Sequence, residues 1–316
     1  MSPRNSSVRR SEYRALERTD RLFLWTIYGA AGLFILLVAL LLLQLIHGSE
    51  ISLKTFGLSF LWTSQWNPVT SKFGALPLIF GTVVSSFIAI ILAGVVGILA
   101  AAYLADFAPS PLAKPLSFII ELLAAVPSVV YGLWGLFVLA PVMREGIGPV
   151  LQHSLGFLPL FSGPIYGVGL LTAGIILALM ILPTVTAISR DVIVAIPTDQ
   201  REASMSLGAT KWETISRVVL PAASAGIFGA LILALGRALG ETIATTMVIG
   251  NRPEIAASLF APSYTLSSVI ANEFTEATTD VYVSALVELG LLLFVVSFII
   301  NGVARIMMRA VFQSRT

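Results

Sequence analysis

The chain has 316 residues, of which 57% are hydrophobic and 11% are charged, and its formal net charge is only +2. A soluble domain carries about 25% charged residues, so this chain cannot cover a water-facing surface, and its main solvent must be lipid. The small net charge does not indicate nucleic acid as a partner, and the absence of cysteine excludes disulfides and thiolate metal sites.

Six apolar runs are long enough to cross a membrane, because a helix needs about 20 apolar residues to do so. They cover residues 22–46, 76–104, 122–143, 166–189, 223–249 and 282–308. The predicted fold class is therefore all-α and integral to the membrane, with six transmembrane helices. The first run is too long for a signal peptide and no small-residue cleavage site follows it, so we interpret it as an uncleaved span.

This pattern divides the chain into five parts. They are a basic tail at 1–21, the first transmembrane helix at 22–46, an outer (periplasmic) loop at 47–75, a core transmembrane domain at 76–308 that contains a long loop at 190–222, and a second tail at 309–316.

Lysine and arginine lie mainly on one side of the predicted bundle. Fourteen of the 19 fall in the N-terminal tail, in the loops after the second and fourth spans, or near the C-terminus, and four fall in the other loops. Because positive charge is retained on the cytoplasmic side, both termini and loop 190–222 are predicted to be cytoplasmic. The last outer loop, 250–281, is acidic and could be either a solvated loop or a docking surface.

Loop 190–222 has the pattern of a structured elbow of two short helices. Asp199 with Glu202, and Thr210 with Glu213, have the spacing of a capping box, in which the two side chains bond each other's backbone donors. The elbow is therefore expected to hold its shape.

Two further residues are expected to end helices in this loop. Gly208 suits a left-handed helix end, where a Cβ would be penalised, and Pro221 is expected to stop the second helix. A rigid cytoplasmic elbow indicates either a contact for another protein or an amphipathic pair of helices on the lipid surface.

A longer motif runs through the elbow: Glu202-Ala203-Ser204, then Gly208, then Val218-Val219-Leu220-Pro221. With Ser204 in place of Ala and Val218 in place of Ile, its spacing resembles the signature of permease subunits of bacterial ABC importers. The resemblance implies that this segment is a coupling helix, which docks in a cleft of a separate ATPase. The residues that it assigns to this contact are Glu202, Ala203, Ser204, Gly208, Leu220 and Pro221.

Nothing in the sequence indicates an enzyme. The G-x-x-x-x-G-K-[ST] phosphate loop is absent, so ATP hydrolysis would belong to another subunit. The two histidines, His47 and His153, lie far apart in the sequence, so neither a metal site nor a Ser/His/Asp arrangement is predicted, and no cofactor is indicated.

Two charged residues fall inside the fifth run. Arg237 lies near its middle, and Glu241 is four residues further on, within reach for an ion pair on one helical face. A central Arg costs about 2.5–3.5 kcal/mol on insertion scales and should face protein or water. The pair could fix one helix against its neighbours, or Arg237 could bind an anion in transit, whose oxygens a guanidinium matches well.

Other residues of the spans could extend a polar path. Glu288 in the sixth run is expected at a depth similar to that of Glu241, although it could instead be a helix-end carboxylate reached by water. Pro127 and Pro183 are expected to interrupt the third and fourth spans, as broken helices that line cavities do in transporters.

The coupling motif alone indicates only an ABC importer permease, and two further sequence blocks narrow this resemblance. They are Pro-Ser-Val-Val-Tyr-Gly-Leu-Trp-Gly at 127–135 and Gly-Arg-Ala-Leu-Gly-Glu-Thr at 236–242. They are similar to the phosphate-specific permeases of the PstC type, and the likeness covers nearly the whole chain from residue 22. It implies the type I ABC importer permease fold, a bacterial inner membrane location, and a translocation pathway at Arg237 and Glu241.

The implied partners are a second, PstA-type permease, two copies of an ABC ATPase, and a periplasmic or lipid-anchored phosphate-binding protein. The alternatives are a permease for sulfate, molybdate or phosphonate, a secondary transporter or channel without an ATPase, and a signalling scaffold.

Overall fold

The computed structural model describes residues 4–312, which are mostly helical; the longest connections without a helix are 63–75 and 249–265. Six helical stretches are long and apolar enough to cross a membrane, as predicted: Phe23–Gly48, Leu76–Phe107, Ser128–Leu155, Leu170–Val194, Lys211–Leu239 and Asp280–Arg309.

The helices follow one another as α1 (Arg4–Gly48), α2 (Glu50–Phe56), α3 (Ser59–Trp62), α4 (Leu76–Ala102), η1 (Tyr103–Phe107), α5 (Ser110–Ala124), α6 (Ser128–Trp134), η2 (Gly135–Leu139), α7 (Ala140–Val142), η3 (Met143–Ile147), α8 (Gly148–Leu155), η4 (Pro159–Phe161), α9 (Leu170–Val194), α10 (Thr198–Ser206), α11 (Lys211–Thr214), η5 (Ile215–Val219), α12 (Leu220–Leu239), α13 (Ile243–Val248), α14 (Leu266–Glu273) and α15 (Asp280–Phe312). All the η segments are π-helical turns except η4, which is a 3₁₀ helix.

The centre of the bundle is α9, which packs against both α4 and α12. Small residues allow the close approach, as is usual between helices in lipid. A Cβ added to Gly174 would meet Ile88 of α4 at 2.5 Å, and one added to Gly226 of α12 would meet Val192 at 2.5 Å. These glycines therefore fix the spacing of the three central helices.

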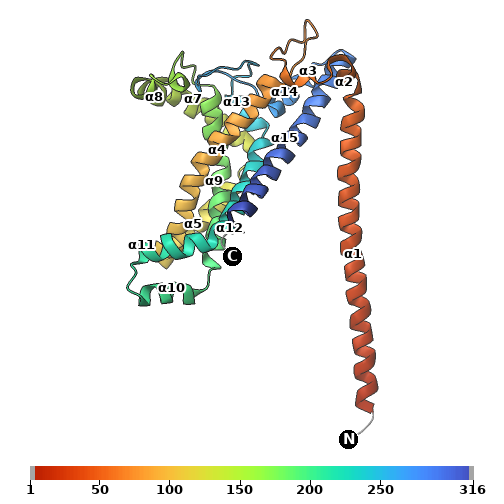
Figure 1. Ribbon diagram of the computed structural model, residues 1–316, viewed down its shortest axis with the longest axis vertical. Coiled ribbons are helices and arrows are strands. Elements are labelled where there is room, and N and C mark those ends of the chain that lie inside the picture. The colour runs from red at the N-terminus through yellow and green to blue at the C-terminus, as the bar shows by residue number, and fades with distance from the viewer. Residues whose placement is uncertain (1–3, 313–316) are drawn as a thin grey trace.

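The bundle has two distinct ends (Figure 1). One end carries α10 and α11, and the opposite end carries α2, α3, α8 and α14. Following the predicted orientation, we call these the inner and the outer end.

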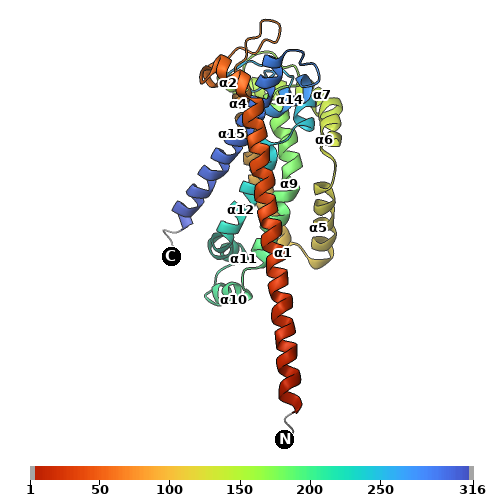
Figure 2. The same ribbon diagram turned by 90° about the vertical axis from the view of Figure 1, so that its right-hand side faces the viewer.

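Helix α1 stands apart from the other helices along most of its length (Figure 1). It packs only near its outer end, where Gly48 contacts Val287 of α15 and Leu45 approaches Gly290. It begins at Arg4, so most of the predicted basic tail 1–21 continues the first helix. In both views (Figures 1 and 2) the start of α1 extends beyond α10 at the inner end.

The third span differs from its predicted bounds of 122–143. The chain leaves the helix before Pro127, whose backbone is extended (φ −58°, ψ 140°), and a new helix then continues to Leu155. Proline removes a backbone donor and disfavours the helical conformation of the residue before it. The predicted interruption at Pro127 is therefore correct, and Figure 2 shows α5 and α6 as two stacked helices. The third span therefore extends beyond its predicted end at 143, as far as Leu155.

The prolines at 183 and 221 do not act as predicted. Pro183 is buried inside the continuous helix α9. Pro221 does not stop a helix, because the chain runs without a break from Lys211 to Leu239. The π-helical turn η5 directly precedes Pro221, and such a turn, like tight packing, accommodates a proline by local adjustment of the backbone bonds.

The fifth span, predicted as one helix over 223–249, is broken instead. Helix α12 ends at Leu239, and α13 starts at Ile243. The three intervening residues include Glu241, so the break lies one turn beyond Arg237.

Candidate functional site

The inner elbow, which we define as α10, α11 and the turn between them, is built by local sequence signals. Gly208 has a positive φ of 87°, as the predicted left-handed helix end requires. The capping box of Thr210 and Glu213 is also present: the Glu213 amide donates to Thr210 Oγ1 at 3.3 Å, and the Thr210 amide donates to Glu213 Oε2 at 2.9 Å.

The predicted cap at Asp199 is wrong. Helix α10 starts at Thr198 after the extended backbone of Pro197, and no side chain caps it. Asp199 lies in the first turn, where a negative charge is favourable beside the positive end of the helix dipole.

Arg201 joins the elbow to the bundle. Its Nε lies 3.2 Å from Asp106 Oδ1 in η1, and its Nη2 donates to the Ile193 carbonyl at 2.7 Å. A third bond goes to the Ile196 carbonyl. This contact could not be predicted from the sequence, because Asp106 lies 95 residues away and in another helix.

The second half of the elbow is fixed by three weaker contacts. The hydroxyls of Ser204 and Thr214 lie 3.0 Å apart and join α10 to the start of the fifth span. Lys211 Nζ lies 5.3 Å from the centre of the Phe107 ring, and the Trp212 ring lies 6.3 Å from it. The elbow is therefore a rigid extension of α4 and α9.

The face of the elbow that points away from the bundle is open. Glu202, Ala203 and Gly208 are exposed, as a docking contact requires. Leu207 is 90% exposed and Met205 is 47% exposed, so two apolar side chains of the elbow are accessible beside these residues.

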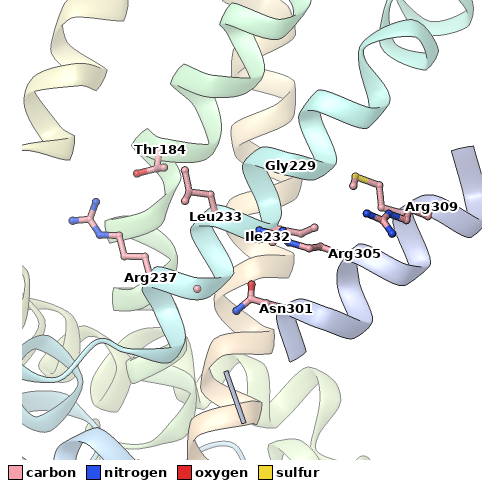
Figure 3. Close-up of a pocket in the computed structure, with 10 residues that line it drawn as sticks. Thr184, Gly229, Ile232, Leu233, Arg237, Asn301, Arg305 and Arg309 are labelled. Carbon is pink, nitrogen blue, oxygen red and sulfur yellow. The ribbon is translucent and has the colours of Figure 1, made fainter. Parts of the chain in front are cut away.

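A cavity of about 820 Å³ lies between α12 and α15 (Figure 3). Its lining residues are Thr184, Gly229, Ile232, Leu233, Gly236, Arg237, Asn301, Arg305, Met308 and Arg309. In Figure 3, Arg237 lies at one end of this set and Arg309 at the other.

Two glycines keep the cavity open on the α12 side. A Cβ at Gly229 would meet nothing within 4 Å, and one at Gly236 would meet only the Asn301 amide at 3.8 Å. They differ in this from Gly226 on the same helix, which packs tightly against α9.

Arg237 and Glu241 do not form the ion pair that their spacing allowed. Both residues are described by the structure, and none of its ion pairs joins them. The reason is the end of α12 at Leu239, after which a spacing of four residues no longer equals one turn. Glu241 Oε1 accepts instead from the Ala244 amide of α13 at 3.2 Å.

Glu288 lies apart from this cavity. It is 4% exposed and lies beside Ser52, beneath α2 at the outer end. The Ser52 amide donates to Ser284 Oγ at 3.0 Å, which holds α2 on α15. Within the described chain, Glu288 Oε2 has no hydrogen-bond partner. The structure therefore does not bring Glu288 together with Arg237 and Glu241.

One acidic residue of the outer loop has a packing role. Glu273 Oε2 accepts from Trp66 Nε1 at 2.7 Å and from the Tyr282 hydroxyl at 2.6 Å. The Phe73 ring stacks on Tyr282 with centroids 5.1 Å apart. Glu273 thus clamps loop 47–75 to the start of α15.

The fold is that of a multi-pass membrane protein, with a structured elbow at one end and a cavity lined by three arginines between its last two spans. Residues 93–313 match the family described as the binding-protein-dependent transport system inner membrane component, and the chain belongs to this family.

The curated relatives of this chain carry a more specific name than the family does. The phosphate transport system permease protein PstC of Mesorhizobium japonicum is 48% identical, over 97% of this chain and 95% of its own length. The protein of the same name from Pasteurella multocida is 45% identical over 86% of both chains. A probable PstC from Methanocaldococcus jannaschii is 35% identical over 91% of this chain and 93% of its own.

Solved structures support the fold. A bacterial ABC transporter involved in the import of alginate matches with a TM-score of 0.60 at 17% identity, over 91% of this chain and 96% of that chain. The MetNI methionine ABC transporter in an inward-facing conformation matches with a TM-score of 0.54 at 18% identity, over 74% and 94% of the two chains. The chain therefore has the predicted type I ABC importer permease fold and is a multi-pass membrane protein.

Proposed function

We propose that this chain is one permease subunit of an ATP-driven importer that moves inorganic phosphate across the bacterial inner membrane. The observation that carries the proposal is its 48% identity with PstC of Mesorhizobium japonicum over 97% of the chain. The elbow supplies the contact that such a permease needs, and the cavity supplies positive charge for the anion.

The partners in this proposal are a PstA-type permease, two copies of an ABC ATPase and an outer phosphate-binding protein. ATP hydrolysis belongs to the ATPase, which binds the open face of the elbow at Glu202, Ala203 and Gly208. Ser204 contributes indirectly, because its hydroxyl contacts that of Thr214 and so holds α10 against α11. Leu220 and Pro221 are the first two residues of α12, so they carry a movement of the elbow into that helix.

Arg237 is proposed as the counter-charge for phosphate within the membrane, since a bare anion cannot cross hydrocarbon. Glu241 shapes the break in the fifth span beside it, because it caps α13. Glu288 is proposed instead as part of the packing between α2 and α15.

The proposed orientation places both termini and the elbow in the cytoplasm. The distribution of lysine and arginine supports it. The start of α1 and the end of α15 also lie toward the inner half of the bundle, the side that carries the elbow (Figure 1).

The test is co-purification of the tagged chain from its own membranes in a mild detergent. We expect an ABC ATPase and a second permease in the eluate, and loss of the ATPase alone from the Glu202→Lys variant. A chain that carries phosphate without any associated ATPase would be a secondary transporter. Uptake that sulfate, molybdate or phosphonate inhibits as well as phosphate does would indicate another oxyanion.

A further inference from the structure

The inner half of α15 carries a row of polar residues on one face. Asn301, Arg305 and Arg309 follow at intervals of four residues, which places them on one stripe of the helix, each about 6 Å further along its axis. All three line the cavity that also contains Arg237. The row therefore adds two cations on the α15 side of the cavity, whereas the guanidinium of Arg237 projects from the other side of α12 (Figure 3).

The charges in this cavity are not neutralised by the chain. Among the residues whose side chains the structure describes, no ion pair involves Arg237, Arg305 or Arg309. None of the described residues that line the cavity is acidic. Cations that face a cavity in a lipid-embedded protein, without a counter-charge, favour the binding of an anion.

The hydrogen-bonding groups of these three side chains indicate which anion the cavity suits. A guanidinium presents a planar fork that bonds two oxygens of a phosphoryl group at once, so Arg305 and Arg309 suit any phosphoryl oxyanion, including that of a lipid headgroup. Asn301 adds selectivity. Its Nδ2 donates to the Ser297 carbonyl at 2.8 Å, which leaves Oδ1 as an acceptor beside Gly236. Inorganic phosphate carries a proton at neutral pH and can donate to this oxygen, whereas sulfate and a lipid phosphodiester cannot.

We propose that Asn301, Arg305 and Arg309 form a second oxyanion site for inorganic phosphate at the inner end of the cavity. The site rests on the proposed phosphate transport and adds the step at which phosphate leaves Arg237 toward the cytoplasm. A site that is open to the cytoplasm in one conformation also binds phosphate from that side and stabilises that conformation. Internal phosphate must therefore slow import.

The experiment uses the whole importer in liposomes, with the binding protein outside and ATP inside. The initial rate of radiolabelled phosphate uptake is measured against rising internal phosphate, or rising internal sulfate. Wild type is expected to be slowed by internal phosphate and much less by sulfate. Arg305→Gln and Arg309→Gln should each raise the half-inhibiting internal phosphate concentration about tenfold, the effect of losing one charged hydrogen bond.

Two further variants refine the result. Arg305→Lys keeps the charge but not the fork, and a smaller rise is expected. Asn301→Leu should bring the sensitivities to phosphate and sulfate together. Arg144→Gln is the matched control, because Arg144 is exposed at the outer end and paired with Glu145, and it should behave as wild type.

The outcomes separate the two proposals. Wild type that takes up no phosphate contradicts the proposed function itself. Wild type that transports, with Arg305→Gln, Arg309→Gln and Arg305→Lys all as sensitive to internal phosphate as wild type is, overturns the site. An effect of these variants that appears only when the liposomes contain phosphatidylglycerol, and is absent in phosphatidylcholine alone, assigns the arginines to a lipid headgroup and also overturns it.

Discussion

Arg201 of the elbow is ion-paired with Asp106 at the inner end of the second span, with Nε and Oδ1 3.2 Å apart and side chains only 15% and 12% exposed. The same guanidinium bonds the carbonyls of Ile193 and Ile196, where α9 ends. One side chain thus connects α10 with η1, which continues α4, and with the end of α9.

The first prediction concerns this connection. Arg201→Ala should lower the free energy of unfolding by about 3 kcal/mol, since removal of one partner leaves a largely buried charge unpaired. It should also reduce phosphate-stimulated ATP hydrolysis in the assembled importer. Thermal unfolding and ATPase assays measure the two effects. Asp106→Asn should cost less, because Arg201 keeps its bonds to the two carbonyls.

The matched control is Arg217→Ala, which removes an exposed arginine next to the elbow. It should leave both measurements unchanged. If Arg201→Ala behaved like this control, the ion pair would have no part in transmission.

The second prediction concerns the turn of the elbow. Gly208→Ala should destabilise the elbow by about 1 kcal/mol, because an L-residue is strained at positive φ although its Cβ would meet nothing. Gly208→Asn should cost less, since Asn tolerates this conformation. Limited proteolysis of the elbow measures the effect. Gly146→Ala is the control, because its Cβ also has free space but its φ is not positive, and equal sensitivity of the two Ala variants would contradict the account.

Arg237 is the subject of the third prediction. Arg237→Gln should leave the protein inserted and assembled but reduce phosphate uptake at least about tenfold, since a charged hydrogen bond to the anion is lost. Arg237→Lys should retain part of the activity. The outer Arg252→Gln, which loses only the exposed pair with Glu254, serves as the control. Normal uptake by Arg237→Gln would make Arg237 a structural residue.

For Glu288 the fourth prediction is that transport is little changed, in contrast to the loss of uptake expected for Arg237→Gln. Since no ion pair of the described residues involves Glu288 and it lies outside the cavity, Glu288→Gln should transport within about twofold of wild type and change the free energy of unfolding by less than about 1 kcal/mol. Glu288→Lys should not fold, because it buries a cation without a partner. A loss of uptake by a stable Glu288→Gln protein would return this residue to the pathway.

The fifth prediction concerns the outer clamp. Glu273→Ala should destabilise the outer end by about 3 kcal/mol, because it removes two hydrogen bonds to a charged acceptor. Glu276→Ala is its control: Glu276 is an exposed neighbour whose side chain bonds no residue in the part of the chain that the structure describes. Hydrogen exchange of loop 47–75 measures the difference, and similar exchange in the two variants would contradict the clamp.

Local signals predicted local structure well. The six spans follow from apolar length, the helix end at Gly208 from the freedom of glycine, and the box of Thr210 and Glu213 from its spacing. Pro127 broke a helix as expected. Each of these depends on residues within a few positions of one another, which the sequence displays directly.

What the sequence did not reveal depends on tertiary packing. Pro183 and Pro221 stay helical because neighbouring helices and a π-helical turn compensate for the lost bond. The break after Leu239, which separates Arg237 from Glu241, follows no proline. The bonds of Arg201 to Asp106 and of Glu273 to Trp66 join positions 95 and 207 residues apart, and no spacing rule connects them.

The most direct test of the account is phosphate accumulation by the purified importer in liposomes, with this chain as one permease. We predict that internal ATP drives phosphate uptake against its gradient, that uptake requires the binding protein, and that Arg237→Gln reduces uptake at least about tenfold without dissociating the complex. Phosphate flux that is independent of ATP, or a complete complex that transports another anion and not phosphate, would contradict the account.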